Sequence, residues 1–297
     1  MTELIAALDI GGTKTQLVIE ELGGRRIVDV TEPSEDWEAE PASIAGPWIA
    51  RRVERHVPAG GRVVSLAFGA QGIDRRETAH QLEQMLAHLG YPTVAVNDAS
   101  LLIAAGGFAQ GIGVISGTGA IAVGADAKGN FMAAGGWGWV LGDDGGASAI
   151  VREATKAALY ARDEGKPDDG LLSALVSDYG VADAERLTRK VNDEPTMDNW
   201  ASHAPAVFTA ADAGSELAIK VIETGARGLA DNVRQLMVRG AVGTDVVIAG
   251  SVFVNQARLR DNFTRALKEL EPQLRVHLLQ KAPVEGAVFL ARRVAAK

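Results

Sequence analysis

Near the start of the chain, the stretch LDIGGTKT places one carboxylate, two glycines, two threonines and a lysine between two short apolar runs. Glycines in a tight turn let a phosphate oxygen approach the backbone N–H groups, because no Cβ stands in the way. The candidates for phosphate contact here are Gly11, Gly12, Thr13 and Lys14. Thr13 would add a hydroxyl donor and Lys14 a positive charge. The alternative is an ordinary glycine-rich β-turn.

A second turn of the same kind occurs in the stretch VISGTGAIAV, where Gly117, Thr118 and Gly119 lie between two β-prone runs. The chain therefore has the pattern of a duplication, and two such turns facing each other could hold a polyphosphate from both sides. The same stretch formally fits the G-x-G-x-x-A dinucleotide fingerprint, but that fingerprint opens a helix, whereas β-prone residues follow here. No G-x-x-x-x-G-K-[ST] motif is present.

Two carboxylates lie at the ends of predicted strands. Asp9 directly precedes the first turn, where a divalent cation such as Mg²⁺ would reconcile a carboxylate with bound phosphates. Its alternative role is that of an Asx-type turn residue. Asp98, in the stretch VNDAS, lies where a strand gives way to a helix, a position that faces the ligand crevice in α/β folds. It could accept a proton from an attacking hydroxyl, or it could only cap the helix.

The stretch GGWGWVLGDDGG (135–146) combines glycines, indoles and carboxylates. Its glycines favour a loop that presents an indole face together with polar groups, a mixture that suits a sugar. In the alternative interpretation both tryptophans are ordinary, partly buried aromatics, with Trp139 the stronger case, and Asp143 and Asp144 cap the next helix.

Composition limits the classes of function. The chain has 297 residues, of which 47% are hydrophobic and 23% charged, as in soluble proteins with a substantial core, and two domains are the first expectation. The absence of cysteine excludes disulfides, thiol catalysis and cysteine-bound metal clusters. The five histidines lack a metal-binding spacing. A net charge of −8 without a basic cluster opposes nucleic-acid binding and favours a small-molecule partner. The lack of a signal peptide or a long apolar segment predicts a cytoplasmic protein that does not bind membranes.

Hydrophobic periodicity predicts an α/β protein whose strands and helices position these groups. The first half is predicted to contain an antiparallel meander and then alternating elements: strands 4–10, 15–20 and 26–30, helix 41–56, strand 62–68, helix 74–89, strand 92–97 and helix 99–107. The second half is predicted to repeat the meander, with two strands within 113–124 and a third near 130–134. After it come helix 146–161, helical pieces over 165–205, helix 212–238, strand 246–250, helix 256–270, strand 273–279 and helix 284–296.

Taken together, these motifs resemble the BadF/BadG/BcrA/BcrD-type ATPase family of the sugar kinase, Hsp70 and actin superfamily, and within it the N-acetylglucosamine and glucosamine kinases. The resemblance spans nearly the whole chain. It rests on both glycine turns, on the tryptophan loop, and on the stretches LAFGAQG (66–72), NDA (97–99), VIAGSV (247–252) and APVEGAVFLA (282–291).

The resemblance implies two actin-like lobes of ribonuclease H type around a central nucleotide cleft. Residues 1–108 would form the first lobe and 109–283 the second, with the closing helix, 284–297, packing back on the first. ATP and Mg²⁺ are the implied cofactors. Asp98 would be the base for the sugar 6-hydroxyl and Asp9 would hold Mg²⁺. The other implied contacts are Thr13 and Thr118 to phosphates, Gly136, Trp137 and Asp143 to the sugar, and Gly250 with Ser251 in the nucleotide site.

The implied activity is ATP-dependent phosphorylation of N-acetylglucosamine or glucosamine, and the resemblance allows a homodimer. Glu35 or Glu38 would favour a free amine by charge attraction. A kinase of another hexose and a non-catalytic, nucleotide-sensing actin-like protein are the alternatives. The activator ATPases of the same branch need a cysteine-bound cluster, which this chain cannot build. The zinc-containing sugar kinases need a cysteine cluster and an E-x-G-H motif, and both are missing.

Overall fold

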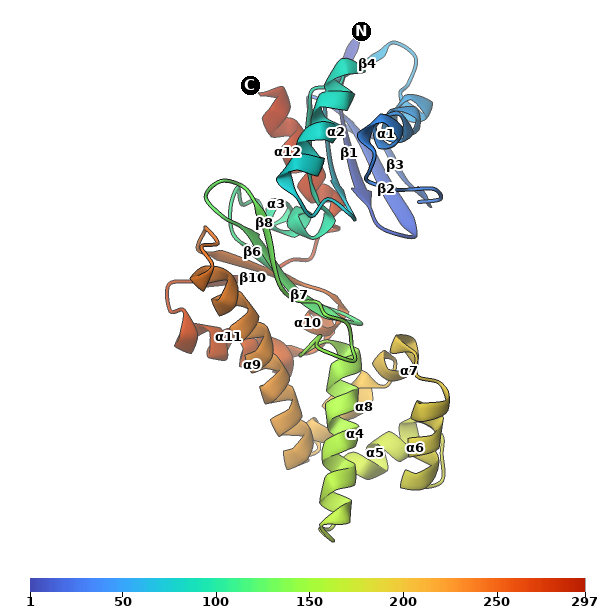
Figure 1. The fold of residues 1–297 in the computed structure, drawn as a ribbon, viewed down its shortest axis with the longest axis vertical. Helices are drawn as coiled ribbons and strands as arrows, with labels where there is room; N and C mark the ends of the chain where they lie inside the picture. The colour runs from blue at the N-terminus through green and yellow to red at the C-terminus, as the bar shows by residue number, and fades with distance from the viewer. Residues whose placement is uncertain (297) are drawn as a thin grey trace.

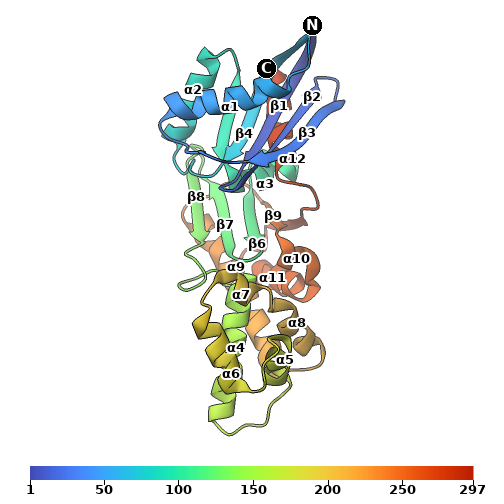
Figure 2. The ribbon, with the colours of Figure 1, turned by 90° about the vertical axis from the view of Figure 1, so that its right-hand side faces the viewer.

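The computed structural model of the protein describes residues 1–296 and shows two β-sheets that follow each other along an elongated molecule (Figures 1 and 2). The start of the chain and its last helix lie together at one end, and a group of helices forms the other end. Lys297, which the sequence assigns to the first lobe, lies outside the described residues. No helix within residues 1–296 is long and apolar enough to cross a membrane.

The first sheet has the strand order β3-β2-β1-β4-β5. Strands β1, β2 and β3 form the predicted antiparallel meander, and β4 and β5 run parallel to β1. Two helices join β3 to β4 and β4 to β5, and two short helical segments follow β5. The bounds are β1 (Thr2–Ile10), β2 (Lys14–Glu21), β3 (Arg26–Pro33), α1 (Ala42–His56), β4 (Gly61–Ala70), α2 (Arg76–His88), β5 (Thr93–Asn97), η1 (Asp98–Ser100) and α3 (Leu101–Ala105).

The second sheet repeats this connectivity, with the order β10-β9-β6-β7-β8. Its first three strands are again an antiparallel meander, and β9 and β10 are again parallel to the first of them. The strands are β6 (Ile112–Ser116), β7 (Ala120–Ala125), β8 (Phe131–Gly135), β9 (Asp245–Ala249) and β10 (Arg275–Leu278). The predicted α/β class and the predicted duplication are therefore confirmed.

The helices of the second half form the lower part of Figure 1. They are α4 (Ala147–Asp163), α5 (Leu171–Asp178), α6 (Ala184–Asp193), α7 (Met197–Ala201), α8 (Ala204–Asp212), α9 (Glu216–Val238), α10 (Ser251–Asn255) and α11 (Ala257–Leu270), and the chain closes with α12 (Val284–Ala295). The predicted helix 212–238 begins too early. Gly214 has a left-handed φ of 102°, and the Ser215 side chain accepts the N–H of Ala218, so α8 ends and α9 starts anew.

Strand β1 is buried on both faces, which explains its nearly continuous apolar sequence. Leu4 and Leu8 pack in a core with the helix residues Ile49 and Leu82, whereas Ile5 packs in a second core with residues of α12. Helices α1 and α2 thus cover one face of the first sheet, and α3 and α12 cover the other.

Helix α3 is packed between the two sheets. Leu101 belongs to the core of the first half, whereas Leu102 packs with Val247 of β9 in a small core against the second half. Two glycines make room for Leu101. A Cβ on Gly69 of β4 would lie 2.4 Å from Leu101 Cγ, and a Cβ on Gly286 of α12 would lie 2.1 Å from the Leu101 carbonyl oxygen. The backbone that follows Asp98 is therefore fixed by close contacts on both sides.

Helix α12 is attached to the first half by polar contacts as well. Ser65 Oγ donates a buried hydrogen bond of 2.8 Å to the carbonyl of Ala291. The buried Glu20 pairs with Arg292 of α12, and Arg26 lies 2.7 Å from Glu285. These contacts support our proposal that the first lobe comprises 1–108 with the closing helix, and that 109–283 form the second.

We expect Gly286→Ala to lower the free energy of unfolding by about 1–3 kcal/mol, the range for overpacking, although alanine is the better helix former. The added methyl would collide with the backbone of α3, which cannot move aside as a side chain can. Chemical denaturation measures this change. Gly23→Ala is the control, since its site is open. A Gly286→Ala protein as stable as wild type would contradict the close packing of α3 on α12.

Candidate active site

The first glycine turn joins β1 to β2 and is closed by a hydrogen bond of 3.0 Å from the Gly11 N–H to the Lys14 carbonyl. Gln71, directly after β4, lies against it: a Cβ on Gly12 would come within 2.5 Å of Gln71 Oε1. The Gln71 backbone is itself held, because its N–H donates to Ile10 and its carbonyl accepts from Trp37 Nε1. Thr13 and Lys14 are exposed at the tip of the turn.

Asp9 and Asp98 come together at the ends of β1 and β5. Burial raises the pKa of Asp9 to about 6, the negative charge of Asp98 adds to this rise, and the nearby Lys14 opposes it. Burial also raises the pKa of the Asp98 carboxyl, and the Asp74 carboxylate contributes. Because three carboxylates face one lysine, this end of the sheet has an excess of negative charge that a cation would relieve.

Asp98 is the first residue of η1, and the residue before it is the helix cap. Asn97 Oδ1 accepts the N–H of Ala99 at 3.0 Å, and Asp98 Oδ1 accepts the same N–H at 2.9 Å. The predicted helix 99–107 thus begins as a 3₁₀ turn. Asn97 takes the cap position that was an alternative for Asp98.

The second glycine turn joins β6 to β7 and packs on the start of α4. The Gly117 N–H donates to the Gly119 carbonyl at 2.9 Å, and Ser148 Oγ donates to the Thr118 carbonyl at 2.7 Å. Gly250 lies directly against it, with a left-handed φ of 102° and a virtual Cβ only 2.2 Å from the Ser116 carbonyl oxygen. Ser251 Oγ lies 3.9 Å from a virtual Cβ on Gly117. The predicted residues of the second turn and of VIAGSV therefore come together.

The tryptophan loop turns out of β8 through glycines with left-handed φ, among them Gly136 at 71° and Gly138 at 85°. Trp137 is 76% exposed, and Leu141 is 83% exposed. Trp139 instead packs on Trp200, with ring centroids 5.7 Å apart, in line with its interpretation as a packing residue. Trp137 is thus free to offer its indole face to a ligand.

Asp143 is buried beneath this loop, at 5% exposure and with a left-handed φ of 57°. A Cβ on Gly119 would lie 2.6 Å from Asp143 Oδ2. Burial raises the pKa of Asp143, whereas the nearby backbone N–H groups of Gly138 and Ala120 oppose the rise. Its carboxylate therefore joins the second turn to the tryptophan loop, and its contact with a sugar stays a prediction. Helix α4 starts after Gly146 without a side-chain cap, so neither Asp143 nor Asp144 caps it.

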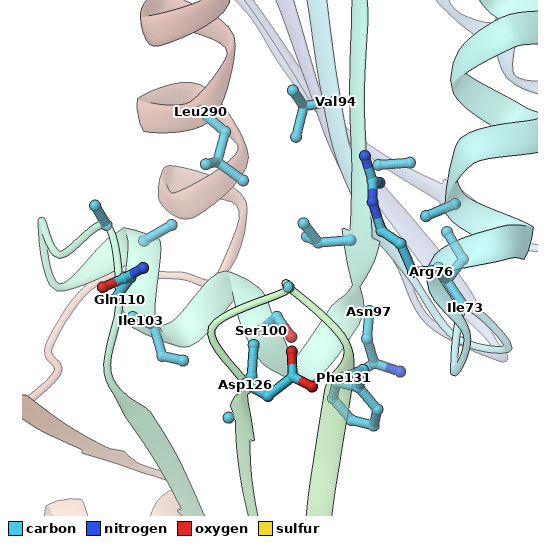
Figure 3. Close-up of a pocket in the computed structure, with 18 of the residues that line it drawn as sticks. Ile73, Arg76, Val94, Asn97, Ser100, Ile103, Gln110, Asp126, Phe131 and Leu290 are labelled. Carbon is cyan, nitrogen blue, oxygen red and sulfur yellow. The ribbon is translucent and has the colours of Figure 1, made fainter. Parts of the chain in front are cut away.

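A cavity of about 520 Å³ lies where β5, α2 and α3 meet the hairpin between β7 and β8 (Figure 3). Asn97, directly before Asp98, and Ser100, the last residue of η1, line it together with Asp126 and Phe131 of the second half. The glycine turns do not contribute to its lining. Since both halves form this cavity, its shape depends on how they are set relative to each other.

The two clusters of predicted residues remain separate in this structure. Asp9, Lys14 and Asp98 belong to the first half, and the second turn with Gly250 belongs to the other. Segment η1 lies near β7, but within residues 1–296 no hydrogen bond joins the first turn to the second. A ligand that contacts both turns would have to bridge the two halves.

Sequence reasoning missed several residues at these positions. Gln71 lies in a stretch that was noted, yet no role was assigned to it, and Asp74 was not considered. The usable signal was positional: both follow β4, and the ends of parallel strands meet at one edge of a sheet. Among residues 1–296, no group of three His, Cys, Asp or Glu side chains could hold a metal ion by itself.

Comparison with known proteins first defines the class of fold. A structure from Chromobacterium violaceum, provisionally assigned as an N-acetylglucosamine kinase, superposes with a TM-score of 0.65 and 21% identity, covering 97% of this chain and 98% of that chain. The sequence then gives the family. It matches the BadF/BadG/BcrA/BcrD ATPase family over residues 8–291, and the chain belongs to that family.

Two curated relatives match almost their whole length. An N-acetylmuramic acid/N-acetylglucosamine kinase of Clostridium acetobutylicum is 28% identical, covering 97% of this chain and 98% of the relative. An N-acetyl-D-glucosamine kinase of Dictyostelium discoideum is 24% identical, with the same coverage. Both relatives are therefore matched as complete proteins rather than over a shared fragment.

We expect Asp9→Asn to stabilise the protein at pH 8 in a buffer free of divalent cations, by up to about 3 kcal/mol. The raised pKa of Asp9 means that the folded state holds this proton longer than the unfolded state, so stability falls as pH rises from about 4 through about 6. The difference between variant and wild type should vanish near pH 4.

Thermal melting from pH 4 to pH 8 measures this effect. Asp163→Asn is the control, because that carboxylate is exposed at the end of α4. If Asp9→Asn were less stable than wild type at pH 8 without divalent cations, the carboxylate of Asp9 would not be destabilising, and the electrostatic interpretation of this site would be wrong.

Proposed function

We propose that the protein is an ATP-dependent kinase that phosphorylates the 6-hydroxyl of an amino sugar, N-acetylglucosamine or glucosamine. The observation that carries this proposal is the location of Asp98, a partly buried carboxylate beside Asp9 at the edge of the sheet where the first glycine turn lies. The names of the full-length relatives support the substrate class.

The two turns are suited to the polyphosphate of ATP. Gly11, Gly12, Thr13 and Lys14 would bind it from the first half. Gly117, Thr118 and Gly119 would bind it from the second half, with Gly250 and Ser251 next to them on the nucleotide side. Backbone amides in glycine turns and a single lysine offer donors and charge without bulk, which suits a group with many anionic oxygens.

Asp98 would act as the general base. Its carboxylate accepts the proton of the 6-hydroxyl while the sugar oxygen forms a bond to the γ-phosphorus, and the bond from that phosphorus to the β–γ bridging oxygen breaks to release ADP. The proton passes later from Asp98 to solvent. Burial helps this step, since it raises the pKa of Asp98 and thereby makes its carboxylate a better proton acceptor.

Asp9 fits Mg²⁺ by the chemistry of its surroundings. It is a partly buried carboxylate with a pKa of about 6 because of burial and of Asp98, and one lysine is its counter-charge. Mg²⁺ in phosphoryl-transfer sites takes one or two carboxylates and completes its shell with phosphates and water, so a site of few protein ligands is expected. When bound, Mg²⁺ would neutralise charge on the phosphates. Asp9 would hold it directly or through water.

The tryptophan loop is the candidate for sugar binding. Trp137 is exposed beside the glycine backbone of Gly136, and its indole could stack on the apolar face of a sugar ring. Asp143 would act through this loop or by direct contact. A cytoplasmic location agrees with the need for ATP.

Sugar-dependent release of ADP from Mg-ATP tests the proposal. The sugars are N-acetylglucosamine, glucosamine, glucose, mannosamine and N-acetylmuramic acid. We expect an amino sugar to give the highest kcat/KM. Strongest stimulation by glucose would indicate a kinase of another hexose. ATP binding without stimulation by any sugar would favour the nucleotide-sensing alternative.

We expect Asp98→Asn to fold and bind ATP but to lose at least about 10²-fold in kcat, because the amide cannot take the proton of the hydroxyl. Steady-state kinetics with saturating sugar measure kcat, and calorimetric titration with an ATP analogue measures nucleotide binding. A nearly unchanged kcat would remove Asp98 from the role of base.

Trp137→Ala should raise the KM for sugar by about 5-fold or more, as loss of a stacking contact of about 1 kcal/mol implies, with a much smaller effect on the KM for ATP. Val140→Ala, a change at an exposed neighbour in the same loop, is the control. A larger effect on ATP than on sugar would refute a role of Trp137 in sugar binding.

A further inference from the structure

A hydrogen-bonded pair lies directly behind the proposed base. Asn97 Nδ2 donates to Asp74 Oδ1 at 3.0 Å, while Asn97 Oδ1 accepts the N–H of Ala99 at 3.0 Å. Both ends of one carboxamide are thus occupied, by an acceptor on one side and a donor on the other. Asn97 is only 8% exposed. In Figure 3 its amide nitrogen points away from Asp126, toward the side of Ile73 and Arg76.

The Asp98 side chain accepts the same backbone N–H, that of Ala99. Its Oδ1 lies 2.9 Å from the N of Ala99, so Asn97 and Asp98 compete for one donor. A carboxylate at the start of a helical turn is a good cap and would turn fully onto this N–H if the competitor were absent. An Asp98 carboxylate held in that way would accept a hydrogen bond from the backbone rather than from a substrate hydroxyl.

We propose that Asp74 and Asn97 form a positioning pair that shares the Ala99 N–H with Asp98, so that this N–H does not bind the Asp98 carboxylate alone and the carboxylate stays available to the sugar hydroxyl. The inference rests on the proposed function and adds two residues to it. Asp74 acts through Asn97: as long as it accepts from Nδ2, the carboxamide cannot flip, and Oδ1 stays directed at Ala99. Neither residue needs to touch the substrate.

The hydrogen bond of Asp74 and its negative charge can be tested separately. Asp74 is exposed, and the influence of an exposed charge is weakened by solvent, whereas its hydrogen bond to the largely buried Asn97 depends only on an acceptor oxygen. Asparagine at position 74 keeps such an oxygen without the charge. Alanine removes both. The two variants therefore give different results if the pair works by position.

The kinetic test compares Asp74→Ala with Asp74→Asn, using the amino sugar that wild type phosphorylates best. We expect Asp74→Ala to lower kcat by about 10-fold, as loss of one positioning hydrogen bond of about 1.4 kcal/mol implies, with the KM for ATP within about 2-fold of wild type. Asp74→Asn should keep kcat within about 3-fold of wild type. Glu77→Ala, which removes a nearby exposed charge in the first turn of α2, controls for charge and should leave kcat unchanged.

Equal losses in both Asp74 variants would overturn the positioning role in favour of an effect of charge, and an unchanged kcat in Asp74→Ala would overturn it altogether. A melting temperature of Asp74→Ala equal to that of wild type, together with the loss of kcat, supports the proposal. A loss of kcat that only follows a large drop in melting temperature would assign Asp74 to stability instead.

A crystal structure of Asp74→Ala tests the pair without any activity. We expect the Asn97 carboxamide to leave the Ala99 N–H, which the two side chains share in the wild-type structure, and the Asp98 carboxylate to become its only acceptor. An Asn97 and Asp98 unchanged from wild type would overturn the proposal, even if no sugar stimulated ADP release. The two failures give different results. If the proposed function is wrong, no sugar stimulates the wild-type protein. If the positioning role is wrong, Asn97 and Asp98 are unchanged in the Asp74→Ala structure.

Discussion

The packing of α3 between the two sheets is the constraint on which the candidate site depends. Leu101 fills the space left by Gly69 and Gly286 in the first half, and the next residue, Leu102, packs on Val247 in the second. Asp98 lies only three residues before Leu101. Its backbone is therefore fixed by contacts that both halves supply, and the closing helix α12, far away in sequence, takes part in holding it.

Glycine has a second function in this chain besides the one that its turns suggest. Gly250 lets α10 begin directly against the backbone of the second turn, and Gly119 leaves space for the buried carboxylate of Asp143. Glycines that look like phosphate-binding residues in the sequence are thus also the places where backbone segments touch. Both roles need the same missing Cβ, so the sequence pattern alone cannot tell them apart.

The strands and the duplication could be predicted from the sequence, because a two-residue period and glycine turns are local signals. The meeting of Asp9 and Asp98 followed from a general rule, that parallel strands end at one edge of their sheet. The burial of Asp143 and the bond between Asp74 and Asn97 could not be predicted. Both features depend on tertiary structure: on how a loop folds back and on which strand ends are neighbours. The break before α9 was missed although Gly214 and Ser215 are recognisable end and cap residues.

The electrostatics of the free protein suggest why closure of the two halves and nucleotide binding should be coupled. Asp9, Asp98 and Asp74 concentrate negative charge on the first half, where Lys14 lies near Asp9. Burial disfavours the ionised carboxylates of Asp9 and Asp98. The second turn brings backbone donors but, within the described residues, shares no hydrogen bond with the first. A metal-bound polyphosphate would interact with the charged groups of the first half and with the backbone donors of the second at the same time. With either half alone it would make only part of these interactions. Binding would then favour the arrangement in which the turns approach each other, since a ligand shifts a conformational equilibrium only by its difference in affinity for the two states.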